Sequence, residues 1–487
     1  MKKILFTHSY FYRFDTKQWD TKQPYPPLGT IYAAAVMREA GYDVSLFDTA
    51  LIESPENIIP IIENEKPDYL VIYDDGFNYL TKMCLTNMRE AAFRMAEIAK
   101  KRRITVIASS SDAADHYERY LAHGVDFVAI GEGEITIKEL IKKLDNRETN
   151  FKNVEGLAYK ENGDVLRTAP RQIVKELDSF PMPAWDLIDI PSYKKIWLTN
   201  HGYFSLNIAT TRGCPFKCNW CAKPIYGNRY NSRSPQKVAE EIEFLIRNYQ
   251  VKHFWMCDDI FGLKPGWVQE FRDVVRSKEL KFKYKIQSRV DLLLQEDTIS
   301  ALAESGADTV WIGAESGSQK ILDAMDKGTT VEQIYRATEL LKEKGIKPAF
   351  FLQFGYLGET KEDIEKTINM VLELMPEEIG ISVSYPLPGT KFYDIVKEQL
   401  KDKANWTDSD ELALMYKGTF SSSYYKKLHR YVHKVYRKKQ SLLNLKNVIV
   451  NPFGASKKKI RSALALAYYF PMSFIDSFQL KRLEKTA

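Results

Sequence analysis

The chain has 487 residues, 44% of them hydrophobic, which is enough for about two to four domains with apolar cores. Its five cysteines, three of them in one ten-residue run, argue against a disulfide framework and indicate a reducing, cytoplasmic compartment. The net charge is +6, but residues 412–475 hold 13 Lys and Arg and no Asp or Glu, so the rest of the chain carries −7.

The first 145 residues alternate between strand-like and helix-like segments. Apolar runs predict strands at 2–7, 41–47, 69–73, 104–108 and 127–130. Helical patterns cover 28–40, 85–102, 113–123 and a segment from 136. This alternation predicts a doubly wound, Rossmann-like α/β domain over 1–145, with ligands at the carboxyl ends of the strands. The N-terminus, Met1-Lys-Lys-Ile-Leu, is interpreted as the first strand and not as a signal peptide.

Residues 146–200 are expected to form a linker. Gly156 to Gly163 predicts a small hairpin with a glycine turn, and the prolines of 180–186 predict extended chain. Alternation resumes at residue 206. Strands are expected at 206–210, 253–256, 283–288, 309–313, 349–354 and 378–384. Six strand–helix units predict a partial (β/α)6 barrel over 201–395, whose active site lies at the carboxyl ends of its strands.

Residues 396–487 are expected to be a helical C-terminal region. Its basic run precedes an apolar, aromatic segment, 463–475, which is too short for a membrane span and is interrupted by Pro471. We favour a solvated basic helix packed on the barrel; the alternative is peripheral contact with an anionic membrane or a lipid-like substrate. The aromatic and histidine residues between 424 and 436 are interpreted first as packing residues and second as substrate contacts.

The cysteine run, Arg212-Gly-Cys214-Pro-Phe-Lys-Cys218-Asn-Trp-Cys221, indicates a metal cluster. Thiolates select zinc, cuprous copper or iron–sulfur clusters. A closed zinc site needs four ligands, whereas Cys257 and Cys84 are isolated in the sequence. Three thiolates on a four-iron cubane leave one iron open to another ligand. A zinc knuckle and reduced surface thiols are the alternatives.

The C-x3-C-x2-C spacing, with Trp220 before the last cysteine, resembles the cluster loop of radical S-adenosylmethionine (SAM) enzymes. The resemblance implies that Cys214, Cys218 and Cys221 form the catalytic metal site, a [4Fe–4S] cluster. It also implies that the open iron chelates SAM, and that an electron from a donor such as flavodoxin or ferredoxin cleaves SAM to a 5′-deoxyadenosyl radical.

Polar residues follow the predicted barrel strands where SAM would bind. They are Asp258, Arg289, Glu315 and Ser316, and Gly313, at the end of one strand, would allow close approach of the backbone to the cofactor. The segment Gly313-Ala-Glu-Ser-Gly317 resembles the SAM-contacting motif of the family, and carboxylates and cations of this kind match the ammonium and carboxylate groups of SAM. Trp220 is expected beside the same cofactor. Helix caps and surface ion pairs are the alternative roles.

Two phrases of the first domain, Pro26-Pro-Leu-Gly29 and Asp126-Phe-Val-Ala-Ile-Gly-Glu-Gly-Glu134, resemble the cobalamin-binding domain of one radical SAM subfamily. The resemblance implies cobalamin beside Gly131, Glu132, Gly133, Ser109 and Ser110. The sequence departs from the pattern in two ways: Ser109-Ser110-Ser111 replaces a Gly-Gly pair, and the Asp-x-His-x-x-Gly motif is missing. A Rossmann-like domain kept for its architecture is the alternative.

These features predict a cobalamin-dependent radical SAM enzyme that methylates an unactivated carbon of a small or lipid-like substrate. The first alternative is an oxidative cyclase similar to the anaerobic magnesium-protoporphyrin ester cyclases. The second is an iron–sulfur sensor or scaffold without catalysis. We expect no nucleic-acid partner.

Overall fold

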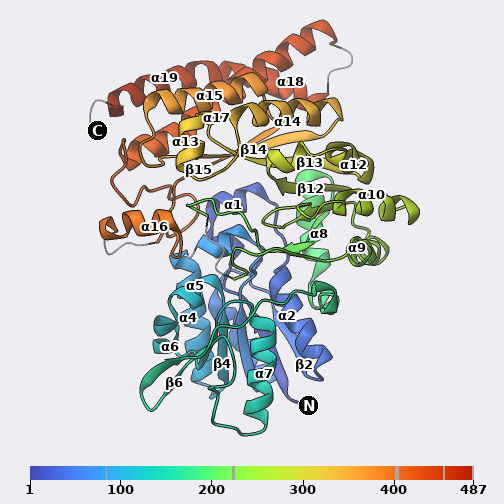
Figure 1. Cartoon of the computed structure of the whole chain (residues 1–487), viewed down its shortest axis with the longest axis vertical. Coiled ribbons are helices and arrows are strands. Elements are labelled where there is room, and N and C mark those ends of the chain that lie inside the picture. Colours follow the sequence, from blue (N-terminus) through green and yellow to red (C-terminus); the bar gives the residue numbers. More distant parts are fainter. Residues whose placement is uncertain (84, 222–224, 401–404, 453–455, 485–487) are drawn as a thin grey trace.

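The computed structural model describes residues 1–83, 85–221, 225–400, 405–452 and 456–484. The N-terminal domain, a barrel and a layer of C-terminal helices follow one another along the long axis of the molecule (Figure 1). The predicted α/β class and the order of its parts are confirmed.

The N-terminal sheet has seven strands in the order β2-β1-β3-β4-β5-β6-β7. Its strands are β1 (Lys3–Thr7), β2 (Asp43–Phe47), β3 (Tyr69–Tyr73), β4 (Thr105–Ser109), β5 (Phe127–Ala129), β6 (Leu157–Glu161) and β7 (Asp164–Arg167). The first five are parallel, and β6 and β7 are antiparallel. The hairpin expected inside the linker therefore extends this sheet.

Helices cover both faces of this sheet, as expected for a doubly wound domain. They are α1 (Thr16–Thr21), α2 (Leu28–Glu39), α3 (Ile58–Glu65), α4 (Thr86–Lys100), α5 (Ser111–Asp115), α6 (Tyr117–Ala122) and α7 (Gly133–Asp145). Apolar residues of α2 and α7 pack with Ile4, Phe6 and Val71 on one face. Residues of α3, α4 and α6 pack with Leu5 and Leu70 on the other.

The connector is more than a linker, because it buries two tryptophans. Trp185 is 1% exposed, and Trp197, on α8 (Ile190–His201), is 0% exposed. The Trp197 indole donates to the carbonyl of Pro24, and that of Trp185 donates to Glu241. These contacts tie the N-terminal domain to the barrel.

The barrel sheet is parallel, in the order β8-β11-β12-β13-β14-β15. Its strands are β8 (Ser205–Ile208), β11 (His253–Met256), β12 (Lys283–Ser288), β13 (Ala307–Glu315), β14 (Lys347–Phe354) and β15 (Glu378–Val383). Its helices are α9 (Pro235–Tyr249), α10 (Trp267–Ser277), α11 (Val290–Leu293), α12 (Thr298–Ser305), α13 (Gln319–Ala324), α14 (Val331–Glu343), α15 (Lys361–Leu374) and α16 (Lys391–Val396). Six parallel strands with outer helices confirm the partial barrel.

Three helices form the C-terminal layer: α17 (Ser422–Val450), α18 (Lys457–Leu464) and α19 (Leu466–Glu484). The first half of α17 packs on the barrel through Tyr424, Tyr425 and Tyr436, which are at most 2% exposed. The packing role expected for this aromatic face is therefore observed. In the described residues, no helix is both long enough and apolar enough to cross a membrane.

Candidate functional site

The cysteine loop leaves the end of β8 and is closed at its base by a short antiparallel ribbon. In this ribbon β9 (Thr211–Arg212) pairs with β10 (Asn231–Ser232). Gly213 has φ +81°, and a Cβ atom there would collide with the carbonyl oxygen of Arg229. Only glycine tolerates both the conformation and the close approach. The loop therefore starts from a fixed point directly before Cys214.

Asp258, at the end of β11, secures the start of the loop. One carboxylate oxygen accepts from the backbone N–H groups of Thr210 and Thr211 at 2.7 and 2.8 Å, and the other accepts from the Thr210 hydroxyl at 2.6 Å. Burial raises the pKa of this carboxyl to about 6, against the hydrogen bonds that lower it. Both oxygens accept hydrogen bonds from Thr210 and Thr211, so Asp258 anchors the start of the loop; its contact with SAM stays a prediction.

The three cysteines of the loop are partly exposed. Asn219, between them, accepts from the Tyr356 hydroxyl at 2.8 Å and donates to the carbonyl of Ala324 at 2.6 Å. These bonds attach the loop to the end of α13. Trp220 packs against the apolar cluster around Tyr356 and Phe392, and its indole nitrogen is buried with no hydrogen-bond partner in the described part of the chain.

Two cations lie beside the cysteine loop. The Arg289 guanidinium contacts the Cys218 sulfur at 3.9 Å and stacks 3.8 Å from the centre of the Phe216 ring. It also donates to the Lys327 carbonyl at 2.7 Å and pairs with Asp291. Burial lowers the pKa of Lys327, but Glu315 and the Cys218 thiolate outweigh it and raise the pKa above its usual value. Two cations therefore lie close to Cys218, each of them already paired with a carboxylate: Arg289 with Asp291 and Lys327 with Glu315.

Glu315 and Lys327 form a buried ion pair of 2.7 Å at the carboxyl end of β13. Gly313 leaves room for it, because a Cβ atom there would lie 2.7 Å from the Lys327 ammonium. Ser316 is placed elsewhere: its hydroxyl contacts that of Thr367 at 3.1 Å and accepts from the backbone of Ser318, and the residue is 0% exposed. The structure thus brings together Gly313, Glu315 and Arg289 near the cysteines, and gives Ser316 a packing role.

The N-terminal domain meets the barrel through Arg212, directly before Gly213. Its guanidinium pairs with Glu132 and, at 2.8 Å, with Glu134. The three side chains are 5%, 2% and 1% exposed, so the pairs are shielded from solvent. We call Arg212, Glu132 and Glu134 the interdomain clasp. A second contact, between Lys82 and Asp259 at 2.5 Å, joins the same two domains.

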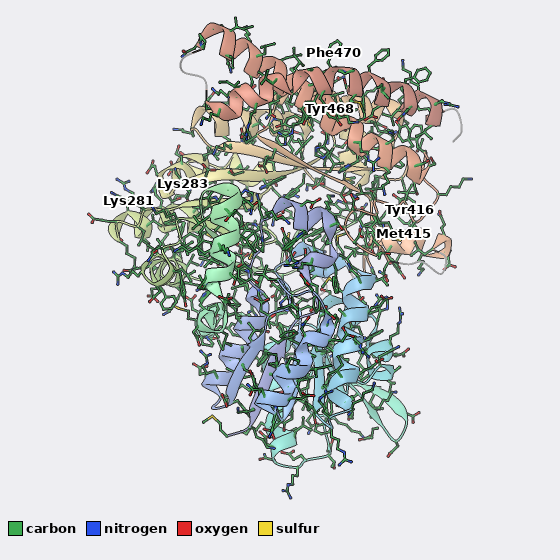
Figure 2. The ribbon with its side chains drawn as sticks, turned by 180° about the vertical axis from the view of Figure 1, so that it is seen from behind. Lys281, Lys283, Met415, Tyr416, Tyr468 and Phe470 are labelled. Atoms are coloured by element: carbon green, nitrogen blue, oxygen red, sulfur yellow. The ribbon has the colours of Figure 1, made fainter. Side chains whose placement is uncertain are left out.

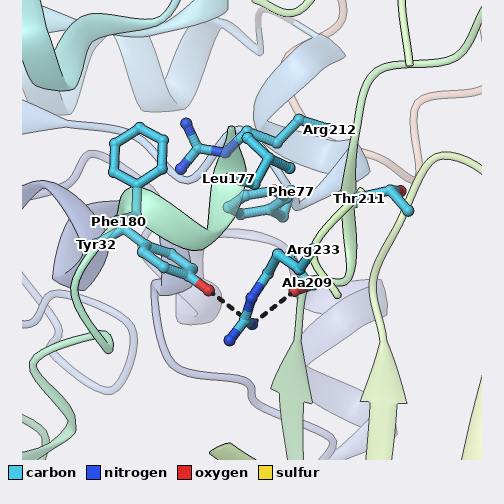
Figure 3. A pocket seen from close by; sticks show the side chains of 8 residues that line it. All are labelled: Tyr32, Phe77, Leu177, Phe180, Ala209, Thr211, Arg212 and Arg233. Carbon is cyan, nitrogen blue, oxygen red and sulfur yellow. Dashed lines mark hydrogen bonds between the residues drawn. The ribbon is translucent and has the colours of Figure 1, made fainter. Parts of the chain in front are cut away.

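Aromatic rings surround the clasp. The Arg212 guanidinium lies 4.3 Å from the centre of the Phe180 ring and 5.4 to 5.6 Å from the rings of Tyr32, Phe77 and Tyr226. Beneath it Arg233 donates to the Tyr32 hydroxyl and to the Ala209 carbonyl (Figure 3). The cavity between these residues is about 10 Å³, room for a single water. This part of the junction is packed protein, not a cofactor pocket.

The other predicted residues of this domain sit at the carboxyl edge of its sheet. Gly133 lies against Ser109, whose hydroxyl would collide with a Cβ atom at position 133. Ser110 caps α5 by accepting from the backbone of Ala113 at 2.8 Å. Gly131 has φ +81° and turns the chain out of β5. The serine run 109–111 thus contacts the glycine loop 131–134 through Ser109, at the end of β4, and Gly133.

Several buried polar atoms at this edge have no hydrogen-bond partner within the described residues. They include the Tyr10 hydroxyl and the Ser111 hydroxyl. A buried polar atom without a partner costs stability unless a ligand or water satisfies it. A cofactor rimmed with amide groups, such as cobalamin, would supply such partners.

Comparison with known families agrees with this layout. Residues 208–371 match the Radical SAM superfamily, and residues 20–141 match the B12 binding domain. The chain thus carries a radical SAM domain over 208–371 and a B12-binding domain over 20–141. The radical SAM match includes the cysteine loop, Asp258 and the Glu315–Lys327 ion pair. The B12-binding match includes Gly131 and Gly133 at the carboxyl edge of the N-terminal sheet.

Three similar proteins illustrate the relationship. An uncharacterized methyltransferase of Pyrococcus horikoshii is 29% identical, over 78% of this chain and 81% of its own. The anaerobic magnesium-protoporphyrin IX monomethyl ester cyclase of Rubrivivax gelatinosus is 28% identical, over 80% and 68%. The solved structure of OxsB, a cobalamin-dependent SAM radical enzyme with aqua-cobalamin bound, has the same fold: TM-score 0.75, 16% identity, covering 99% of this chain and 72% of that one.

The residues present fit the cofactors of this family: a [4Fe–4S] cluster, SAM and cobalamin. Three thiols project from one anchored loop with cations beside them, which suits an anionic cluster. No group of three or more His, Cys, Asp and Glu side chains in the described ranges is arranged to hold a single metal ion. A cubane binds each thiolate through a different iron, so its ligands need not converge on one point.

Sequence reasoning missed Arg212, Glu134 and Lys327 as functional residues. Arg212 and Glu134 stood inside quoted motifs, but their pairing joins positions far apart in the chain. Lys327 follows a short helix and carries no motif of its own. Cys257 is buried and donates to the Ile208 carbonyl, so it packs as a small core residue. Cys84 lies outside the described residues.

Proposed function

We propose that this chain is a cobalamin-dependent radical SAM methyltransferase that acts on an unactivated carbon of a small-molecule or lipid-like substrate. The observation that carries the proposal is the interdomain clasp. It connects the glycine loop of the B12-binding domain to the residue that begins the cysteine loop. Two cofactor domains held in this way act on one substrate between them.

The cofactors supply the hard chemistry: the cluster and SAM provide a radical for hydrogen abstraction, and cobalamin provides a methyl carrier. The protein's part is to bind and orient them. Cys214, Cys218 and Cys221 hold the cluster, and Arg289 and Lys327 stabilise its negative charge. Glu315 and Lys327 offer a carboxylate and an ammonium group, which complement the ammonium and carboxylate ends of methionine.

The segment after the barrel helps to exclude water from the junction. The backbone of Trp406 accepts from Thr86 of the B12-binding domain, and Asn405 donates to the Tyr385 hydroxyl of the barrel at 3.2 Å. The Tyr416 hydroxyl donates to the carbonyl of Gly355. One segment thus contacts both domains, and we propose that it selects the substrate. Radical intermediates need such protection from solvent.

A radical cyclase of the protoporphyrin ester type is the second candidate, because the relative from Rubrivivax gelatinosus covers the same two domains. Methylation consumes SAM in two ways, to S-adenosylhomocysteine and to 5′-deoxyadenosine, whereas hydrogen abstraction alone yields only 5′-deoxyadenosine. We propose a cytoplasmic setting with flavodoxin or ferredoxin as the electron donor.

The experiment is product analysis by mass spectrometry. Reconstituted, reduced protein with hydroxocobalamin is incubated with SAM and cell extract as the substrate source. Equal formation of S-adenosylhomocysteine and 5′-deoxyadenosine is expected. Formation of 5′-deoxyadenosine alone would favour the cyclase, and no SAM cleavage in any extract would favour the sensor. A variant with Cys214, Cys218 and Cys221 changed to Ala is the control for cluster-independent breakdown of SAM.

A further inference from the structure

Exposed apolar side chains are concentrated on the C-terminal helices. Eleven of the 17 large hydrophobic side chains that are exposed in the described residues lie between 442 and 478. On α18 and α19 they are Ile460, Leu464, Tyr468, Phe470, Phe474, Ile475 and Phe478. A soluble surface rarely gathers so many large apolar groups, and such gathering marks an interaction site.

Three exposed phenylalanines of α19 lie on one side of the helix, while Leu480 is buried on the side that packs on the protein. Phe470, Phe474 and Phe478, spaced four residues apart, are 64%, 76% and 65% exposed. The opposite side packs on α17, where Asp476 is 2% exposed and pairs with Lys427 at 3.3 Å and Lys434 at 2.6 Å. The phenylalanine stripe therefore points away from the protein. Tyr468 and Phe470 mark this layer, which is furthest from the N-terminal domain (Figures 1 and 2).

Positive charge lies on the helices α17 and α18, in the same layer as the apolar stripe. Lys446, Lys457, Lys459 and Arg461 are exposed, and none pairs with a carboxylate in the part of the chain that is described. The Lys438 ammonium lies 5.8 Å from the centre of the Phe470 ring. The run from 412 to 475 has no acidic residue that would repel an anion. A helix with an apolar stripe beside cations is the pattern of interfacial membrane binding.

We propose that α17, α18 and α19 dock on the surface of an anionic lipid bilayer, with the stripe Leu464, Phe470, Phe474 and Phe478 at the boundary of headgroups and acyl chains. The charge selects this occupant. A second copy of the chain would bring two surfaces of net positive charge together, which costs electrostatic energy. The B12-binding domain lies at the other end of the molecule and stays in water (Figure 1).

Vesicle sedimentation tests the proposal on the full-length, reconstituted protein. Vesicles of phosphatidylcholine alone are compared with vesicles that also contain phosphatidylglycerol. The protein is expected to sediment with the anionic vesicles and to be released by salt. Replacing Lys457 and Lys459 with Gln should weaken binding by roughly thirtyfold. The matched control replaces Lys281 and Lys283, two exposed lysines of the barrel (Figure 2), and should bind like the parent.

The apolar part is tested by changing Phe470, Phe474 and Phe478 to Ser, which should abolish sedimentation at every salt concentration. The control is Ile395→Ser, an exposed apolar residue of α16 that is 59% exposed. Unchanged circular dichroism and melting temperature show that each variant is folded. Three results would overturn the proposal: no sedimentation with anionic vesicles, unchanged binding by the phenylalanine variant, or light scattering that shows dimers formed through these phenylalanines.

Discussion

Replacing Arg212 with Met removes the cation of the interdomain clasp and keeps most of its apolar stem. Glu132 and Glu134 would then remain buried without a counter-charge, at 2% and 1% side-chain exposure. Removing one member of a buried ion pair typically costs about 3 to 5 kcal/mol. Two carboxylates share this guanidinium, so a loss near the upper end, about 5 kcal/mol, is expected.

Urea unfolding, followed by tryptophan fluorescence, measures this loss. Arg38→Met is the control: Arg38 pairs with Asp186 at 2.8 Å, but the two side chains are 41% and 63% exposed. An exposed pair contributes at most about 1 kcal/mol. Changing Glu132 and Glu134 to Gln in the Arg212→Met background should restore most of the stability, because no buried charge remains.

The pH dependence of Arg212→Met follows from the same contacts. Burial already raises the pKa of Glu132, against the attraction of Arg212 that lowers it. Without the arginine the pKa of Glu132 rises further, so folding favours the protonated acid. The loss of stability relative to the parent therefore grows as pH rises. An Arg212→Met protein that unfolds at the same urea concentration as the parent would refute the stabilising role of the interdomain clasp. So would a variant that combines Arg212→Met with Gln at positions 132 and 134 and is no more stable than Arg212→Met alone.

Three further predictions concern single side chains. Asp258→Asn should cost about 1 to 3 kcal/mol of stability, because the amide nitrogen cannot accept the hydrogen bond that the carboxylate accepts from Thr210. The variant should also retain less iron after desalting. Unchanged iron content and unchanged stability would contradict the role of Asp258 as the anchor of the cysteine loop. Lys327→Met should weaken SAM binding by about tenfold or more in equilibrium dialysis, because Glu315 loses its counter-charge and the SAM carboxylate loses a donor. Unchanged affinity would show that Lys327 does not contact SAM. Burial raises the pKa of Glu359 to about 8 from an ordinary 4.5, so its contribution to stability is complete below pH 4.5 and is lost as pH rises to about 8. Glu359→Gln should flatten that decline and be more stable than the parent at pH 9 by about 5 kcal/mol. A pH profile of stability that runs parallel to the parent's would contradict this prediction.

Local patterns predicted the barrel well. The strand expected at 283–288 coincides with β12, and the other five expected barrel strands overlap β8, β11, β13, β14 and β15. Each strand is a short apolar or alternating run between polar turns, so neighbouring residues carry the information. The helix expected over 113–123 divides into α5 and α6 at His116, whose backbone is not helical. A break set by one residue's conformation has no counterpart in the hydrophobic pattern.

Non-local pairing was harder to predict. The hairpin β6–β7 was expected inside a linker, but β6 pairs with β5 and extends the N-terminal sheet. The sequence of the hairpin does not show which strand it pairs with. The roles of Asp258 and Ser316 escaped prediction for the same reason: their hydrogen bonds reach Thr210 and Thr367, 48 and 51 residues away. The family resemblance identified the cysteine loop from its spacing. The hydrogen bonds of Asp258 and Ser316 could be found only in the structure.

The cysteine loop carries the central claim, that three thiolates hold a four-iron cluster with one iron open to SAM. The most direct measurement is electron paramagnetic resonance of the reconstituted, reduced protein, together with its iron content. We predict about four irons per chain and a spectrum that changes when SAM is added. The variant with Cys214, Cys218 and Cys221 changed to Ala should lose both the iron and the signal. Iron that remains bound to this variant at the parent's stoichiometry would contradict the account.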